Sequence, residues 1–296
     1  MARKISFSHE VKNELARFFA DDEKILQTEL SAMFGVLALN VESRIDFFNT
    51  NAAVARKVVA ITKKIFPNAK IEVAAVRSKN LCKTIKYVVR IFLTSQTENF
   101  FNELFSENYA KKIIEYPNLG VAYLRGAFLA SGSVNRPEKH YNLEIICATK
   151  ISAEFVQKIF KVFDMNANLY ERKGFFVVYI KEGDSICDFL GIIGAEKAVN
   201  RFEVAQNIKE VRAMVNRIVN CETANLNKTI DAAQRQIADI RKIIAKKIKV
   251  DEHIAQTMKF RLKYPDDSAA ELAKKMFLSK PGIMYRFRVI HKLAED

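Results

Sequence analysis

Two apolar segments that each contain a glycine constrain the fold of this chain more than any other feature. They are LSAMFGVLALN, residues 30–40 with Gly35, and YLRGAFLASGSV, residues 123–134 with Gly126. The glycines lie 91 residues apart, at the same point of two segments with a similar order of expected elements. Because a glycine lets two helix backbones approach closely, we expect these helices to pack face to face about a pseudo-two-fold axis. The alternative is that both glycines are simply tolerated in core helices, at a cost of about 1 kcal/mol each.

Hydrophobic periodicity gives each half a similar order of helices and strands. Residues 1–200 are therefore expected to form an α+β domain built from a duplicated αββαββ unit. Ser8 is the expected N-cap of the first helix, and the two hairpins are expected to turn near Lys79–Asn80 and near Lys173–Gly174. The first half has expected helices at 8–19, 30–40 and 52–66, strands at 43–50, 70–78 and 83–93, and a closing segment at 98–105; the second has helices at 123–134, 152–163 and 184–194 and strands at 140–149, 166–174 and 175–183.

Composition excludes several classes of protein. Of the 296 residues 49% are hydrophobic, which is typical of a globular chain, and no run approaches the roughly 18 apolar residues of a membrane span. The N-terminus lacks the apolar centre of a signal peptide, so we expect a cytoplasmic protein without a membrane partner. The four cysteines and four histidines are scattered without a CxxC pair. We therefore expect no metal, no disulfide and no cofactor.

The net charge of +14 indicates a polyanionic partner, for which double-stranded DNA is the first candidate. Residues 201–296 alone contain 20 basic and 12 acidic side chains. Solubility without any partner is the alternative explanation of the charge.

Residues 201–248 are expected to be helical, because they contain neither proline nor glycine. The polar stretch NCETANLNKT predicts a break between two helices. An apolar stripe could connect domains, mediate dimerisation or pack on the N-terminal domain; its members are Leu226, Ile230, Ala233, Ile237, Ile240 and Ile244.

Residues 249–296 are expected to form an all-α helix-turn-helix domain. A helix ends at Pro265, Ser268 and Glu271 form a capping box for a short second helix, FLSK forms a turn, and Pro281 lies near the start of a basic third helix. A three-helix bundle that binds protein is the alternative. The residues expected to face the core are Ile254, Met258, Leu262, Ile283, Phe287, Ile290 and Leu293.

The third helix is the expected recognition helix for a DNA major groove. Residues two apart on a helix point about 200° apart, so Arg286 and Arg288 cannot both face the same base edges. We assign base contact to Arg286 and phosphate contact to Arg288. The candidate DNA-binding residues are Ser279, Lys280, Gly282, Met284, Tyr285, Arg286 and Arg288, with Lys83 and Lys86 on the N-terminal strands.

The second glycine helix resembles the LAGLIDADG motif of homing endonucleases. LRGAFLASG matches that motif at Leu124, Gly126, Ala130 and Gly132. In those enzymes the penultimate acidic residue of each helix binds the catalytic metals, and the matching positions here are Asn40 and Ser131. Neither side chain carries the negative charge needed to hold hard divalent cations. We therefore expect no catalytic residues, no metal site and no enzyme activity.

The order of these parts resembles the WhiA family of bacterial DNA-binding regulators from about residue 6 to residue 293. The matching stretches are FSHEVKNELAR, LRGAFLASGSVNRPEKHYNLEI, NRIVNCETANLNKTIDAAQRQI and YPDDSAAELAKKMFLSKPGI. The resemblance implies a degenerate homing-endonuclease domain (1–200), a helical linker (201–248) and a helix-turn-helix domain (249–296).

The resemblance also implies the function. It indicates a transcription regulator linked to cell division, chromosome segregation and, in spore formers, sporulation, with other transcription or cell-division proteins as further partners. The family typically has Asn and His where this chain has Met284 and Tyr285, which indicates a changed sequence preference. The alternatives are an architectural nucleoid protein and an active homing endonuclease.

Overall fold

The computed structural model describes residues 6–39, 43–77 and 85–295. The chain divides into two compact units, which we call the N-terminal unit (Met1–Lys209) and the C-terminal unit (Glu210–Asp296). Within the described residues, no helix is both long enough and apolar enough to cross a membrane.

The first half of the N-terminal unit alternates helices with three described strands. Ser6, not the expected Ser8, caps the first helix by accepting a hydrogen bond from the backbone N–H of His9, whereas Ser8 donates to the Val134 carbonyl at 2.7 Å. The elements in order are α1 (Phe7–Leu15), α2 (Glu23–Gly35), β1 (Arg44–Asn49), α3 (Ala52–Ile65), β2 (Ile71–Arg77), β3 (Ile85–Phe92), α4 (Ser95–Leu104) and α5 (Glu107–Glu115).

The second half repeats this order with four described strands. The expected turn at Lys173–Gly174 is confirmed, since both residues have positive φ angles, of 52° and 78°. Each sheet is antiparallel, with strand orders β1-β3-β2 and β4-β5-β7-β6. The elements are α6 (Pro117–Ser131), β4 (Gly132–Val134), β5 (Leu143–Cys147), α7 (Lys150–Val162), β6 (Asn168–Arg172), β7 (Phe175–Ile180) and α8 (Gly183–Ile192).

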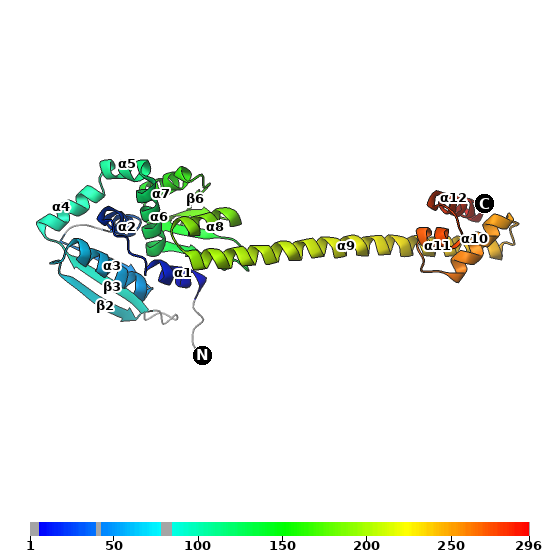
Figure 1. The fold of residues 1–296 in the computed structure, drawn as a ribbon, viewed down its shortest axis with the longest axis horizontal. Helices are drawn as coiled ribbons and strands as arrows, with labels where there is room; N and C mark the ends of the chain where they lie inside the picture. Colours follow the sequence, from blue (N-terminus) through cyan, green and yellow to red (C-terminus); the bar gives the residue numbers. More distant parts are fainter. Residues whose placement is uncertain (1–5, 40–42, 78–84, 296) are drawn as a thin grey trace. The chain divides into compact units, whose positions relative to one another are not determined.

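The two apolar helices, α2 and α6, pack directly against each other at the centre of the N-terminal unit (Figure 1). Both were predicted, but with wrong ends: α2 covers residues 23–35 rather than 30–40, and α6 ends at Ser131, where β4 begins. Gly126 is the glycine that allows the close approach of the two helices, because a Cβ atom at this position would meet the Glu29 carbonyl and the Ala32 methyl group. Gly35 is not its counterpart, because Gly35 lies at the end of α2 with Tyr123 Oη as the nearest atom to its missing Cβ.

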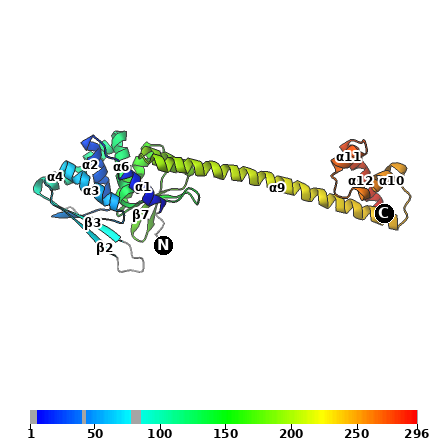
Figure 2. The same ribbon diagram turned by 60° about the horizontal axis from the view of Figure 1, so that its bottom comes forward.

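The helices cover one face of the strands. Figure 2 shows α2, α3 and α6 on the same side of β2, β3 and β7. On β1 and β5 the inward side chains alternate with outward ones, as expected for sheets with one face on the core. The core is continuous across both halves, and its largest apolar members are Phe34, Phe47, Phe101, Phe128, Phe160, Phe189 and Phe202.

A single helix, α9 (Glu196–Ala245), follows α8. The predicted break at NCETANLNKT is wrong, because residues 220–229 are helical throughout. Only Ala233 and Ile240 of the predicted stripe are buried, whereas Leu226 and Ile244 at its two ends are 59% and 56% exposed. The polar side chains of residues 220–229 therefore do not interrupt α9, and Leu226 among them remains exposed.

The C-terminal unit forms its own core from α10 (Glu252–Lys263), α11 (Ala269–Lys275), α12 (Lys280–Glu295) and the end of α9, which contributes Ile240 and Ile243. The predicted capping box is confirmed, with the Ser268 Oγ accepting from the Glu271 N–H and the Glu271 carboxylate accepting from the Ser268 N–H. Leu262 was expected in the core, but it is 41% exposed.

The buried residue at this end of α10 is Arg261. Its Nη1 donates to the carbonyl of Asp267 at 2.6 Å, and longer hydrogen bonds reach Tyr264 and Pro265. The guanidinium carbon lies 5.2 Å from the centre of the Phe287 ring. Arg261 therefore holds the α10–α11 turn against α12 and takes the inner position that a leucine was expected to occupy.

Candidate nucleic-acid interface

The start of α12 is a capped helix N-terminus on the surface of the C-terminal unit. Ser279 precedes the helix, and its Oγ accepts from the Gly282 N–H at 3.2 Å while its carbonyl accepts from the Ile283 N–H at 3.1 Å. The turn before it is closed by the Leu278 N–H, which donates to the Ala273 carbonyl at 2.8 Å, and Phe277 takes a positive φ of 55°. This geometry is the turn of a helix-turn-helix, with Lys280 exposed at the first position of its second helix.

The two sides of α12 differ sharply in burial. Ile283, Phe287 and Ile290 face the core of the C-terminal unit, as predicted. Tyr285 is 62% exposed and lies on the opposite side, flanked by exposed Arg288 and Lys292. The Arg288 guanidinium lies 6.0 Å from the centre of the Tyr285 ring. The outward face of α12 therefore combines an aromatic side chain with two cations.

Arg286 does not lie on that outward face. Its Nη1 donates to the His253 carbonyl and to the Thr257 Oγ1, both at 3.2 Å and both on α10. The guanidinium is thus engaged in joining two helices of the unit, and its hydrogen bonds would have to break before it could reach a base edge. The geometry favours Arg288 over Arg286 as the contacting arginine.

The other flank of α12 meets α9 and includes Met284, with Arg288 at the edge between this flank and the outward face. With Phe287 and His291 they line a cavity of about 240 Å³ whose opposite wall is Ala232, Arg235, Gln236 and Asp239. The His291 Nδ1 lies 2.8 Å from Asp239 Oδ2 across this groove. One flank of α12 is therefore held by α10 and the other by α9, which leaves the face around Tyr285 for a partner.

The two predicted lysines of the N-terminal strands can be placed only in part. Lys83 lies outside the described residues. Lys86 is exposed near the start of β3 and lines a cavity with Ser131. Lys86 therefore lines the same cavity as Ser131, the residue that matches a metal-binding position of homing endonucleases.

The end of α6 is closed by hydrogen bonds and lacks a carboxylate. The Asn49 side-chain amide donates to the carbonyls of Leu129 and Ala130, both at 3.2 Å, and the Ser131 hydroxyl donates to the Ala127 carbonyl at 3.4 Å. After α2, residues 36–39 are all apolar, and Asn40 lies outside the described residues. Within the part of the chain that the structure describes, no three Asp, Glu, His or Cys side chains are grouped in a way that could hold a metal.

Three arginines on the described strands are paired with carboxylates. Asp46 lies 3.3 Å from Arg44 and 3.7 Å from Arg90, and Glu144 lies 3.2 Å from Arg172. Such partly exposed pairs contribute little stability, but they neutralise charge that would otherwise attract a polyanion. These three arginines therefore attract a polyanion less strongly than unpaired arginines would.

Comparison with known proteins identifies the family. The WhiA LAGLIDADG-like domain matches residues 120–212, and the WhiA C-terminal HTH domain matches residues 215–294. The probable cell division protein WhiA of Lysinibacillus sphaericus is 37% identical over 308 residues, covering 98% of this chain and 97% of that protein. The chain belongs to the WhiA family.

Other WhiA proteins and a WhiA crystal structure agree with this assignment. The probable cell division protein WhiA of Clostridium botulinum is 34% identical and covers 99% of this chain and 98% of its own length. Full-length DUF199/WhiA from Thermotoga maritima superimposes with a TM-score of 0.65 at 25% identity, covering 98% of both chains. The predicted fold class is confirmed: a LAGLIDADG-like α+β domain, a long helix and a helix-turn-helix domain.

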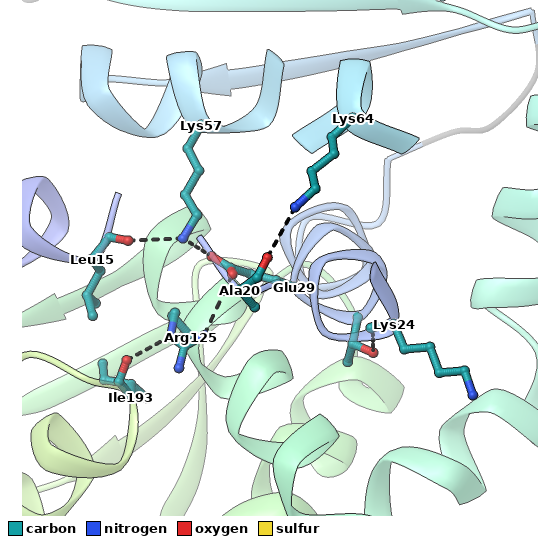
Figure 3. A network of polar contacts seen from close by, with 9 residues as sticks. Leu15, Ala20, Lys24, Glu29, Lys57, Lys64, Arg125 and Ile193 are labelled. Carbon is teal, nitrogen blue, oxygen red and sulfur yellow. Dashed lines mark hydrogen bonds and ion pairs between the residues drawn. The ribbon is translucent and has the colours of Figure 1, made fainter. Parts of the chain in front are cut away.

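A buried ion cluster in the LAGLIDADG-like domain of this WhiA-family chain was not predicted. Lys57 on α3 and Arg125 on α6 both reach Glu29 on α2, with N–O distances of 2.5 and 3.8 Å, and all three side chains are almost fully buried (Figure 3). Lys57 also donates to the Leu15 carbonyl and Arg125 to the Ile193 carbonyl. Burial raises the pKa of Glu29 and lowers the pKa of Lys57, and the attraction between the two charges opposes both shifts.

Two further residues of the WhiA LAGLIDADG-like domain were also missed: Asn49, which caps α6, and Lys12, which lies beside it. A polar residue at an inward strand position is a usable signal for Asn49, because β1 otherwise alternates cleanly. Lys12 follows the buried Val11 on α1, and nothing in the local sequence distinguishes it from a surface lysine.

Proposed function

We propose that this chain is a double-stranded DNA-binding transcription regulator that uses the outward face of α12 for recognition and has no nuclease activity. The observation that carries the proposal is the exposed face of α12 that follows its capped N-terminus, with Tyr285 and Arg288 in its middle and Lys292 in its last turn. A recognition helix enters the major groove with its N-terminal residues at base edges, and this arrangement suits that position.

The proposed contacts divide into two kinds. Ser279, Lys280 and Gly282 lie at the helix N-terminus, where backbone N–H groups and a cation suit a phosphate. Met284 and Tyr285 offer apolar and hydroxyl groups to base edges, and Arg288 reaches either a base or a phosphate. Arg286, first assigned to base contact, is reassigned to positioning α12 through its hydrogen bonds to α10.

Binding to DNA measured at several salt concentrations tests this assignment. Arg288→Ala is expected to weaken binding by roughly 1–3 kcal/mol. If Arg288 contacts a base, the variant also discriminates less between DNA sequences. If it contacts a phosphate, the dependence of affinity on salt concentration has a slope smaller by about one. Arg241→Ala is the matched control, since Arg241 is an exposed arginine of the same unit on α9. Equal effects of the two substitutions would show that α12 is not the recognition helix.

An absence of nuclease activity is proposed from the ends of α2 and α6. Two-metal hydrolysis needs anionic ligands close to the scissile phosphate, and the described residues at both helix ends are apolar, amide or hydroxyl groups. Plasmid DNA incubated with the protein and Mg²⁺ or Mn²⁺ is expected to stay intact. Metal-dependent cleavage that disappears in Ser131→Ala would refute this.

The biological role is proposed from the relatives. Proteins named probable cell division protein WhiA match this chain over nearly their whole length, so we propose a role in cell division and chromosome segregation, with sporulation added in spore formers. A cytoplasmic, nucleoid-associated location and contacts with other transcription or cell-division proteins belong to the same proposal. Chromatin immunoprecipitation with sequencing tests it. Discrete peaks at promoters support a regulator, and even coverage of the chromosome would instead indicate an architectural nucleoid protein.

A further inference from the structure

A cavity of about 290 Å³ opens at the C-terminal end of α6, where a LAGLIDADG nuclease would hold its metals. Its lining contains two lysines, two hydroxyl groups and no carboxylate. The lining residues are Lys12, Phe48, Asn49, Thr50, Lys86, Ala130 and Ser131. The charge of this site is therefore opposite to that of a metal site.

Among the described residues, no carboxylate pairs with Lys12. It lies on α1, half-buried, and burial lowers its pKa to about 8. In that part of the chain the Lys12 ammonium contacts the aromatic ring of Phe128, whose centre lies 5.8 Å from Nζ, and this is a weak contact at that distance. Lys57 shows the usual solution for a buried lysine in the same unit, an ion pair of 2.5 Å with Glu29. An unpaired ammonium facing a cavity is costly unless an anion joins it.

The carbonyl groups at the end of α6 do not serve as that partner. Asn49 is buried, and its amide donates to the carbonyls of Leu129 and Ala130 at this helix end. Lys86, from β3, and the hydroxyl groups of Thr50 and Ser131 add donors around the same space. The cavity thus presents positive charge and hydrogen-bond donors, the combination that suits a tetrahedral oxyanion.

We propose that this cavity binds a phosphate group, held by the ammonium groups of Lys12 and Lys86 with the Ser131 and Thr50 hydroxyls as further donors. The two sources of this chemistry are a phosphodiester of the DNA backbone and a free phosphate or phosphate monoester. Lys12 and Lys86 then neutralise the phosphate directly, where a nuclease would do so through metal ions. The site does not depend on recognition by α12, so it can exist whether or not the proposed function is correct.

Thermal unfolding and calorimetric titration of the full chain with inorganic phosphate test the site, with chloride at matched ionic strength as the reference. Phosphate is expected to raise the melting temperature of the unsubstituted protein, and Lys12→Met is expected to lose at least tenfold in phosphate affinity. Lys63→Met is the matched control, because Lys63 is an exposed lysine of the same unit on α3, outside the cavity. Circular dichroism of Lys12→Met in chloride shows whether that variant is folded; Lys86→Met, at an exposed position, gives a second measurement in which affinity is also expected to fall.

Binding to a short duplex of arbitrary sequence separates the two sources. If the phosphate belongs to DNA, Lys12→Met weakens binding to every sequence and lowers the salt slope by about 0.9, whereas Lys63→Met does not. If the site binds a free phosphate, Lys12→Met loses affinity for inorganic phosphate but keeps its affinity for the duplex. Either result supports the site. Unchanged affinity of Lys12→Met and Lys86→Met for both probes overturns it, while phosphate binding without any DNA binding would leave the site standing and refute the proposed function.

Discussion

Replacement of Gly126 by alanine is the sharpest test of how α2 and α6 fit together. A Cβ atom at this position would overlap the carbonyl oxygen of Glu29 and lie 2.9 Å from the Ala32 Cβ. Both obstacles are rigid: one is helix backbone, and the other is a methyl group attached directly to it. The two helices must therefore separate or tilt, because no side-chain rotation relieves the overlap.

The expected magnitude comes from two opposing effects. Alanine is favoured over glycine in a helix by about 1 kcal/mol. Overpacking a tight core costs about 1–3 kcal/mol and sometimes more, and the upper end applies here because backbone is displaced and the 3.8 Å contact between Arg125 and Glu29 lengthens. The net loss should be about 2 kcal/mol of unfolding free energy. In a unit of this size that lowers the melting temperature by about 4–8 °C.

Gly35→Ala provides the control at the glycine once paired with Gly126 by sequence. Its Cβ would lie 3.4 Å from Tyr123 Oη, an ordinary contact, so the alanine should be neutral or stabilise by up to about 1 kcal/mol. Calorimetry of the full chain separates the transition of the N-terminal unit from that of the C-terminal unit, and only the first should move. If both alanines shift that transition equally, or if Gly126→Ala is neutral, the close approach does not determine how these helices pack.

Three further outcomes follow from the structure. Lys57→Met leaves Glu29 buried without its nearest cation and should cost about 3–5 kcal/mol in chemical denaturation, whereas Lys64→Met, which removes a partly buried contact to the Ala20 carbonyl at 3.4 Å, should cost less than about 1 kcal/mol. Ser268→Ala removes the N-cap of α11 and should lower only the transition of the C-terminal unit, by about 1 kcal/mol; no change would mean that the cap is dispensable. The pKa of Lys12 is about 8 in the folded chain against 10.5 for the free side chain, so below pH 8 its charge opposes folding, and stability rises with pH between these values. The free energy of unfolding of Lys12→Met in chloride should therefore be about 1–2 kcal/mol higher than that of the unsubstituted protein near pH 7. This difference should shrink toward pH 10, and a lower free energy of unfolding at pH 7 would contradict the prediction.

Local signals in the sequence predicted much of the fold. The capping box of Ser268 and Glu271 and the turn at Lys173–Gly174 depend on a few adjacent residues, and both are confirmed. The inward face of α12 follows from one periodic stripe, and Ile283, Phe287 and Ile290 are buried as expected. These features could be predicted because the interactions that decide them lie within one or two turns of the chain.

Features that depend on distant partners were not predictable in the same way. The expected start of α2 was placed at the apolar run, but the helix begins at Glu23 and includes Glu29, which lies in the core. From the sequence, a glutamate at this position is expected on the surface. It is buried because it pairs with Lys57 and Arg125, which lie far along the chain. The polar stretch within α9 was likewise read as a break, although polar residues on an exposed helix need no break.

The candidate site shows the same division. Sequence spacing placed Arg286 and Arg288 on different sides of α12 correctly, since that depends only on helix geometry. It could not assign their roles, because the atoms that engage Arg286 belong to His253 and Thr257 on α10. The cavity beside Ser131 was beyond prediction for the same reason, since Lys12, Asn49 and Lys86 come from three different elements.

The packing of α6 connects the central glycine with that cavity. Gly126 sits over the Glu29 carbonyl, and Arg125, one residue earlier, contacts the Glu29 carboxylate, so the position of α6 along α2 is fixed at two adjacent residues. Five residues further on, the helix ends at Ser131 because the strand β4 begins at Gly132. Asn49 then caps the last carbonyls, and this leaves the Lys12 ammonium facing a cavity rather than a helix end. A shift of α6 by one residue would rotate it by about 100°, which would remove both the contact of Arg125 with Glu29 and the capping by Asn49. The register of two buried helices therefore determines which groups line the site, even though none of the residues that set the register lies in it.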